Sequence, residues 1–213
     1  MYLEINYKRG NIMLIRSKKV WSSSQFLPLT IEVEDNKIVA IYDYNHFDKV
    51  DYDFGDERIL PGFIDVHTHG AYGYDTNDVD EEGLRNWTKN VVAEGVTSFL
   101  PTTITQTEEV LLKAVANVAK VYDEGYEGAE ILGIHFEGPY LDEEKRGAQP
   151  LSCIQTPSVE QFKKFQKASN NLIKLITIAC EKDVDYELTK YLVSQGIRVS
   201  LGHSACNYKE SYL

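Results

Sequence analysis

Residues 60–70 read LPGFIDVHTHG, a strand-like apolar run that ends in two histidines, His67 and His69. Residues two apart on a β-strand point to the same face, so both imidazole rings are expected at the carboxyl end of one strand. Imidazole is a common ligand of transition metals. Taken alone, the pair is as compatible with a chance occurrence as with a metal site.

After residue 57 the sequence alternates between apolar strand-like runs and amphipathic helical stretches, which is typical of a βαβα chain with a parallel sheet. Strands are expected at residues 59–69, 96–103, 131–137, 172–179 and 197–201, and helices at 81–94, 107–121, 159–168 and 186–194. The pattern predicts an α/β fold with a partial (β/α)₈ TIM-type barrel of about five strands in residues 58–213. A complete barrel takes ~250 residues.

The preceding residues, 1–57, contain short runs rich in β-branched and aromatic side chains. These runs lie at residues 11–15, 29–34 and 37–42. Asp35 and Asn36 separate the last two runs, and both residue types favour tight turns, so a β-hairpin is expected there. We predict a small β-sandwich-like domain over residues 1–57.

Composition excludes some partners. The chain has 22 basic and 33 acidic residues and a formal net charge of −11, which repels a polyanion, so no nucleic-acid role is expected. A small anionic substrate is still compatible with this charge, because a few local donors can hold a phosphate. No apolar run approaches the ~20 residues that cross a bilayer, so we expect no membrane association and a cytoplasmic protein.

The three cysteines are Cys153, Cys180 and Cys206. They are odd in number, widely spaced and without a Cys-x-x-Cys pair, so the sequence predicts reduced thiols and no disulfide framework. Cys206 follows His203 by three residues, but no cysteine near it in the sequence could complete a zinc site. A cysteine-bound metal is therefore not predicted.

Two further residues with metal-ligand chemistry lie at the ends of predicted strands. Glu137 ends the third strand and His203 follows the fifth. Singly, the glutamate fits a loop carboxylate held by backbone amides, and the histidine fits a buried core residue. The carboxyl ends of barrel strands share one rim, however, so His67, His69, Glu137 and His203 are expected to converge, as metal ligands do.

Four stretches together resemble one family of enzymes. Residues 60–70 are similar to the first-strand motif of the amidohydrolase superfamily. Residues 133–140 (GIHFEGPY), 146–150 (RGAQP) and 200–204 (SLGHS) resemble three successive motifs of the N-acetylglucosamine-6-phosphate deacetylases, in the same order and with similar spacing. The resemblance extends over most of the chain and implies that residues 58–213 are the amino-terminal half of a metal-dependent amidohydrolase barrel.

The resemblance also implies a ligand set. Glu137 and His203 match two metal ligands of the family, and His67 and His69 match the pair found in members that hold a second metal. We therefore expect one or two divalent ions per site, of zinc, iron or manganese.

Other residues are expected to contact the substrate or to support the ligands. Ala148 and Gln149 match the loop positions that touch the sugar substrate in the family. His135 shares a strand face with Glu137, and a buried role in orienting the ligands is favoured over direct metal binding. Glu181 lies where the family often has a Pro-Glu step, but a solvated strand end is the preferred interpretation.

The activity implied for the complete enzyme is metal-dependent deacetylation of N-acetylglucosamine 6-phosphate to glucosamine 6-phosphate and acetate, a step of amino sugar catabolism. In the resembled family a further histidine ligand and the proton-carrying aspartate come from later strands. The chain contains neither, so no catalytic residue is assigned within it. We expect the isolated chain to be inactive.

Two other functions share part of the pattern. A dihydroorotase-like or deaminase-like amidohydrolase would share His67 and His69, but such enzymes usually carry a carboxylated lysine near the rim where Glu137 lies here. A non-catalytic interaction module could keep the metal-binding residues. An incomplete barrel leaves open sheet edges, so self-association into a homo-oligomer, most simply a dimer, is expected.

Overall fold

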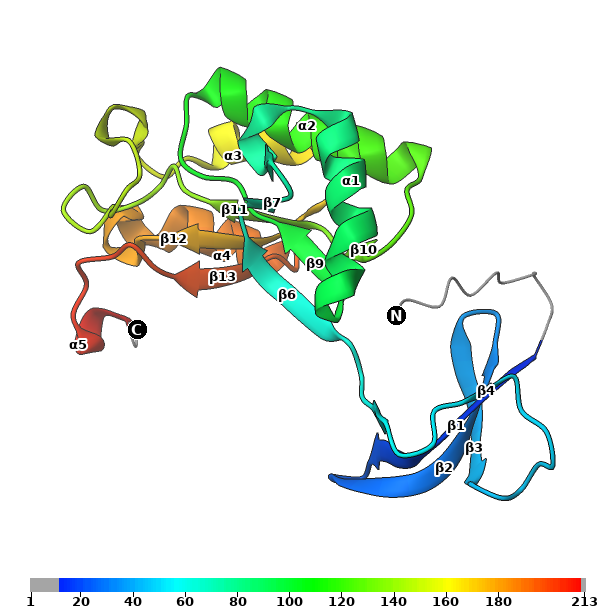
Figure 1. Ribbon diagram of the computed structural model, residues 1–213. Coiled ribbons are helices and arrows are strands. Elements are labelled where there is room, and N and C mark those ends of the chain that lie inside the picture. The colour runs from blue at the N-terminus through cyan, green and yellow to red at the C-terminus, as the bar shows by residue number, and fades with distance from the viewer. Residues whose placement is uncertain (1–11, 212–213) are drawn as a thin grey trace. The chain divides into compact units, whose positions relative to one another are not determined.

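The computed structural model describes residues 12–211 and divides the chain into two compact units, Met1–Gly62 and Phe63–Leu213 (Figure 1). The strands of the first unit are β1 (Met13–Ser22), β2 (Gln25–Glu34), β3 (Lys37–Asp43), β4 (Tyr52–Asp53) and β5 (Arg58–Ile59). They form one five-stranded sheet with the order β3-β2-β1-β4, and β5 pairs with β1. The sandwich-like arrangement expected from the sequence stays a prediction.

The hairpin expected around residues 35 and 36 is confirmed. Strands β2 and β3 pair antiparallel, and Glu34 lies opposite Lys37. Asp35 and Asn36 have φ angles of 47° and 60°. Aspartate and asparagine tolerate this left-handed conformation better than most residues, which is why a two-residue turn forms here.

The second unit is built from strands that pair in parallel. They are β6 (Phe63–Thr68), β9 (Val96–Pro101), β10 (Glu130–Ile131), β11 (Ile134–Glu137), β12 (Ile173–Ile178) and β13 (Arg198–Leu201). The pairings run β6 to β9, β9 to β10, β11 to β12 and β12 to β13. A parallel bridge between Thr102 and His135 joins β9 to β11. Strands that follow one another in the sequence are therefore also neighbours in space.

Two strands expected from the sequence are each divided in two. The run 59–69 contributes Ile59 to β5, which pairs with β1, and resumes as β6 only at Phe63, after Pro61 and Gly62. The run 131–137 forms β10 and β11, separated at Leu132 and Gly133. Gly133 has a φ of 148°, and a Cβ atom there would collide with the Lys174 side chain and the Leu172 carbonyl. Only glycine accepts this backbone conformation together with such a close neighbour, and the ladder breaks at this point.

Helices alternate with the strands as expected. They are α1 (Glu81–Val91), α2 (Glu108–Glu124), α3 (Val159–Ala168), α4 (Glu187–Ser194) and the short α5 (Tyr208–Ser211). Side chains of Asp80, Thr107 and Ser158 cap the amino ends of the first three. Figure 1 shows α1, α2 and α3 on one side of the strands. No helix in the described part of the chain is long and apolar enough to cross a membrane.

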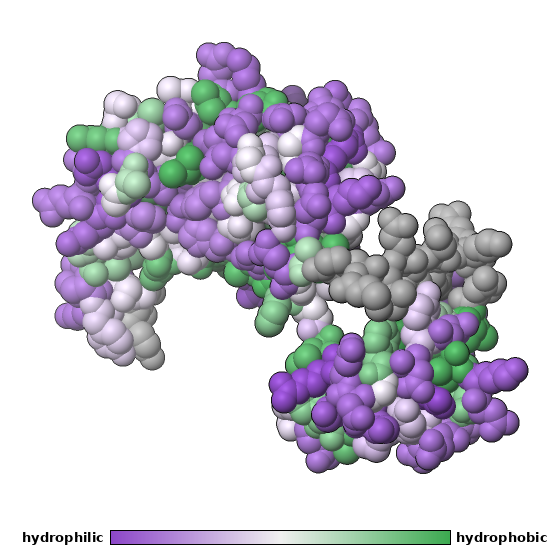
Figure 2. Space-filling view, in the orientation of Figure 1, coloured by the Kyte–Doolittle hydropathy of each residue, from purple (hydrophilic) through white to green (hydrophobic). Residues whose placement is uncertain are grey.

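The hydrophobic core of the second unit packs these helices on the strands. Its largest fully buried side chains include Trp87, Phe99, Phe136, Phe162 and Phe165. The ring centroids of Trp87 and Phe99 are 4.7 Å apart, which joins α1 to β9. In Figure 2 the outer surface over the helices is mainly hydrophilic.

Strand β6 contrasts with this core because its apolar side chains are exposed. Phe63 is 70% exposed, Ile64 61% and Val66 50%. Among the described residues β6 pairs only with β9, and β13 pairs only with β12. Both ends of the strand series are therefore open edges, and β6 leaves apolar side chains uncovered on both of its faces.

Candidate metal centre

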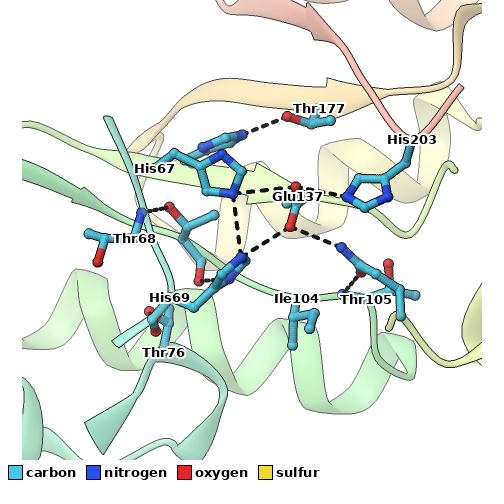
Figure 3. A network of polar contacts seen from close by, with 12 residues as sticks. His67, Thr68, His69, Thr76, Ile104, Thr105, Glu137, Thr177 and His203 are labelled. Carbon is cyan, nitrogen blue, oxygen red and sulfur yellow. Dashed lines mark hydrogen bonds and ion pairs between the residues drawn. The ribbon is translucent and has the colours of Figure 1, made fainter. Parts of the chain in front are cut away.

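Four side chains from three strand ends meet at one point (Figure 3). His67 and His69 come from the end of β6, Glu137 ends β11, and His203 follows β13. The Nε2 atoms of His67 and His203 lie 3.4 and 3.2 Å from Glu137 Oε1, and His69 Nε2 lies 3.2 Å from Oε2. The structure thus brings together all four residues expected as metal ligands.

The second nitrogen of two of these rings faces a backbone carbonyl. His69 Nδ1 is 3.2 Å from the Thr102 oxygen, and His203 Nδ1 is 3.0 Å from the Lys145 oxygen. A carbonyl only accepts hydrogen bonds, so Nδ1 carries the proton and, in a neutral ring, Nε2 presents a lone pair. These lone pairs point at the shared centre, which is how imidazole ligands are oriented around a metal.

The electrostatic repulsion among the ligand-type atoms at the centre is relieved by a positive charge. His67 Nε2 and His69 Nε2 are 3.4 Å apart, and both face the carboxylate of the buried Glu137. Lone pairs and a carboxylate at such distances repel one another unless a proton or a cation lies between them. The hydrogen bond with Glu137 raises the pKa of His69, so a proton can meet this need in part.

The carboxylate itself is held in its charged form. Burial of Glu137 acts to raise its pKa, but the hydrogen bond from His69 and the charges of the neighbouring histidines outweigh burial and lower it. Three nitrogen donors and one ionised oxygen donor form a set that suits zinc and other divalent transition metals. The residues present therefore fit such an ion.

His135 lies behind this ligand set. Its Nδ1 is 2.9 Å from the Val66 oxygen and its Nε2 is 2.8 Å from Thr177 Oγ1, so both nitrogens already have partners. Burial lowers the pKa of His135 to about 4, and the nearby charge of His67 acts in the same direction. A neutral, fully hydrogen-bonded ring whose centroid is 4.6 Å from that of His67 positions that ligand by packing.

Gln149 is buried and holds Glu137. Its Nε2 donates to Glu137 Oε2 at 2.9 Å, and its Oε1 accepts from the Thr105 backbone amide at 2.7 Å. The amide therefore fixes the rotation of the carboxylate, a role that the sequence did not suggest. Ala148, the other residue expected to touch substrate, is exposed on the same loop.

Two further supports were not expected from the sequence. Strands β7 (Gly70–Ala71) and β8 (Tyr74–Asp75) form a tight hairpin directly after His69. The hairpin brings the chain back to His69, so that the Thr76 amide and hydroxyl both donate hydrogen bonds to the His69 carbonyl. Thr102 accepts from the Thr68 amide, and its carbonyl faces His69 Nδ1. The only sequence signal for this supporting role of Thr102 is its position directly after a predicted strand.

Comparison with known proteins identifies the family. The chain belongs to the amidohydrolase family, whose model matches residues 58–188. It is 41% identical over 152 residues to the N-acetylglucosamine-6-phosphate deacetylase of Bacillus subtilis (strain 168), covering 70% of this chain and 38% of that protein. It is 37% identical over 183 residues to the deacetylase of that name from Lysinibacillus sphaericus, covering 85% and 47%.

A solved structure extends the likeness to the fold. N-acetyl-D-glucosamine-6-phosphate deacetylase from Mycobacterium smegmatis, determined in complex with N-acetyl-D-glucosamine-6-phosphate, matches with a TM-score of 0.87 and 25% identity. The match covers 95% of this chain and 52% of that one. The chain thus spans about half the length, or less, of the relatives that it matches.

Proposed function

We propose that this chain is part of a metal-dependent deacetylase that converts N-acetylglucosamine 6-phosphate to glucosamine 6-phosphate and acetate. The observation that carries the proposal is the convergence of three imidazole Nε2 atoms on the buried Glu137 carboxylate at the ends of parallel strands. The named activity of the relatives supports the choice of substrate. A phosphorylated substrate is charged and does not cross a bilayer unaided, so we place the activity in the cytoplasm.

We infer that the second unit, Phe63–Leu213, forms about half of a (β/α)₈ barrel and that the first unit, whose sheet includes β5 at Arg58–Ile59, is a separate small β-domain. The order of the parallel strands and the two open edges support this inference. Further strands would cover the exposed Phe63, Ile64 and Val66 of β6. A second copy of the chain would cover the same edges in a homodimer.

His67, His69, Glu137 and His203 would hold the divalent ion. When bound, such an ion lowers the pKa of its water towards ~7 and polarises an acetamide carbonyl. The carbonyls of Thr102 and Lys145 keep His69 and His203 in the tautomer that binds through Nε2. We propose that Ala148 and Gln149 border the sugar and that an aspartate beyond this chain passes a proton to the departing amine.

The test extends the chain with the carboxyl-terminal half of the Bacillus subtilis relative and measures acetate release from N-acetylglucosamine 6-phosphate. Activity should require a divalent metal and fall with chelator. Glu137→Gln should lower kcat/KM by at least ~10²-fold, because it removes a charged ligand. The matched control is Glu144→Gln, at an exposed position of the loop after β11, and it should change kcat/KM little.

One outcome would move the assignment elsewhere in the superfamily. A folded, metal-loaded chimera that hydrolyses dihydroorotate and releases no acetate from the sugar phosphate would contradict the proposed substrate. A folded chimera that binds metal and has neither activity would favour an interaction module.

A further inference from the structure

Two cysteines that lie 26 positions apart in the sequence meet in the structure. Cys180 opens a 3₁₀ turn (Cys180–Lys182) just after β12, and Cys206 lies in the segment after β13. Ile178 pairs with Leu201 in the parallel β12–β13 ladder, so the chain leaves both strands at the same end of the sheet. The partner cysteine that the sequence did not provide near Cys206 is therefore supplied by the fold.

The two thiols share their surroundings with a carboxylate. The sulfur atoms of Cys180 and Cys206 and a carboxylate oxygen of Glu181 all lie within 4.8 Å of one another. Zinc binds sulfur at ~2.3 Å with tetrahedral geometry, which places two ligating sulfurs about 3.8 Å apart. Side-chain shifts of about 1 Å or less would thus bring the three donors to ligand distance, which is within the reach of rotamer adjustment.

Glu181 can bind an ion while it keeps its hydrogen bonds from Ser204 and Ala205. Its Oε2 accepts from the Ser204 hydroxyl at 2.6 Å and its Oε1 from the Ala205 amide at 2.6 Å. Each carboxylate oxygen has two lone pairs, so one remains on Oε1. The Cys180 thiol also donates to Oε2 at 3.9 Å, and an ion that replaces the thiol proton would take that position. The bonds from Ser204 and Ala205 orient the carboxylate in the way that surrounding donors orient metal ligands. Glu181 is exposed just after β12, as expected for a solvated strand end, and its carboxylate is in addition anchored by these two donors.

The site differs from a reactive dithiol. Cys180 is only 5% exposed, and burial raises its pKa to about 11, so the thiol is protonated at neutral pH. Thiol–disulfide exchange requires a thiolate with access to an oxidant, and a buried thiol of high pKa is poorly suited to it. A soft divalent ion displaces the proton when it binds, and the half-exposed Cys206 gives it a route in.

We propose that Cys180, Glu181 and Cys206 bind a zinc ion through two thiolates and one carboxylate, separately from the histidine centre. Three protein ligands leave a fourth position for water. The ion would tie the end of β12 to residues 203–206, the segment that carries His203. It would therefore act as a brace that holds His203 at Glu137, and it would not take part in hydrolysis.

Cobalt(II) is the probe that separates the two centres. A cobalt–thiolate bond gives an intense charge-transfer absorption in the near ultraviolet, whereas the histidine centre offers only nitrogen and oxygen ligands. Titration of the metal-free 213-residue chain with cobalt(II) should produce this band, and added zinc should abolish it. The band should persist in the His67→Ala, His69→Ala double variant, which disables the other site.

Matched variants test each ligand. Cys180→Ser and Cys206→Ser should both abolish the band, whereas Cys153→Ser, which alters the cysteine outside the cluster, should keep it. Glu181→Gln keeps the shape and an acceptor oxygen but loses the charge, so cobalt affinity should fall roughly tenfold or more. Circular dichroism of each variant, compared with the parent chain, shows whether a lost band reflects lost ligation or lost folding.

Three results would overturn the proposal. One is a folded, fully reduced chain that gives no near-ultraviolet band at saturating cobalt. Another is a band that survives in Cys180→Ser or Cys206→Ser. The third is a purified chain in which Cys180 and Cys206 are joined in a disulfide, seen as a mass lower by two hydrogens and restored by reductant, because the pair would then be a redox element.

Discussion

Strands β11 and β6 both deliver ligands to the candidate metal centre, yet their surroundings are opposite. All four residues of β11 are buried, whereas β6 exposes Phe63, Ile64 and Val66. Strand β11 lies between β9 and β12, and β6 has a described neighbour on one side only. The difference shows that an apolar strand sequence does not by itself mean that the strand is buried among the described residues. The exposed apolar side chains of β6 are suited to packing against a neighbour that is not present among those residues.

The largest expected effect compares one phenylalanine from each strand. Phe136 in β11 is fully buried, so Phe136→Ala should destabilise the second unit by about 3–5 kcal/mol. Phe63 in β6 is 70% exposed, so Phe63→Ala should change stability by less than ~0.5 kcal/mol. Urea unfolding of both variants measures the two values.

The same pair sharpens the inference about the missing neighbour. In a chimera carrying a carboxyl-terminal half, Phe63→Ala should become costly, because its ring would then be covered. If the cost of Phe63→Ala stays below ~0.5 kcal/mol in a folded chimera, the added half does not pack on β6, and the half-barrel inference is wrong.

A smaller effect is expected at the glycine that follows β11. Gly138 has a φ of 74°, and a Cβ atom there would collide with Thr105 Oγ1, next to the amide that holds Gln149. Gly138→Ala should cost roughly 1–3 kcal/mol more than Gly73→Ala. Gly73, in the hairpin after β6, has a similar φ of 81° but open space around it. If thermal unfolding shows equal losses of stability for the two variants, the cost comes from backbone strain alone and the contact with Thr105 adds nothing.

The smallest effect concerns acid sensitivity of the loop after β11. A hydrogen bond from Lys182 lowers the pKa of Asp142, at an Nζ–Oδ2 distance of 3.0 Å. A lowered folded-state pKa means that the stabilisation is present above the unfolded pKa of ~3.9 and is lost as pH falls through the folded value. Asp142→Asn should therefore destabilise at pH 7 by less than ~1 kcal/mol, because Lys182 is partly exposed, and have little effect near pH 2. Unfolding curves at both pH values test this; an equal loss at both would contradict it.

Local sequence signals predicted the elements well. Thr107 indicated the start of α2, and its side chain caps that helix; Asp35 and Asn36 indicated the hairpin turn. Strand-end placement also anticipated which four ligand-type residues the structure brings together, because parallel strands share one edge. Their role as metal ligands remains a proposal.

Contacts between distant segments could not be predicted in this way. The division of the strand at Gly133 depends on the close approach of Lys174, and the orientation of the Gln149 amide depends on the Thr105 backbone. The proximity of Cys180 and Cys206 depends on the register of β12 and β13. Each requires the position of a second segment before the first can be interpreted. Periodicity and capping describe one segment at a time, so they carry no signal for such pairs.

The sequential order of the parallel strands has a consequence for synthesis. Apart from the step from β10 to β11, which is joined through β9, the parallel strands pair with the next one along the chain, so they can dock in the order in which they leave the ribosome. His67 and His69 emerge first, but the ligand set is complete only after His203 is made. At ~5–20 residues per second this interval is on the order of ten seconds, and for about its first half, until Glu137 is made, the nascent chain presents two histidines without their carboxylate partner.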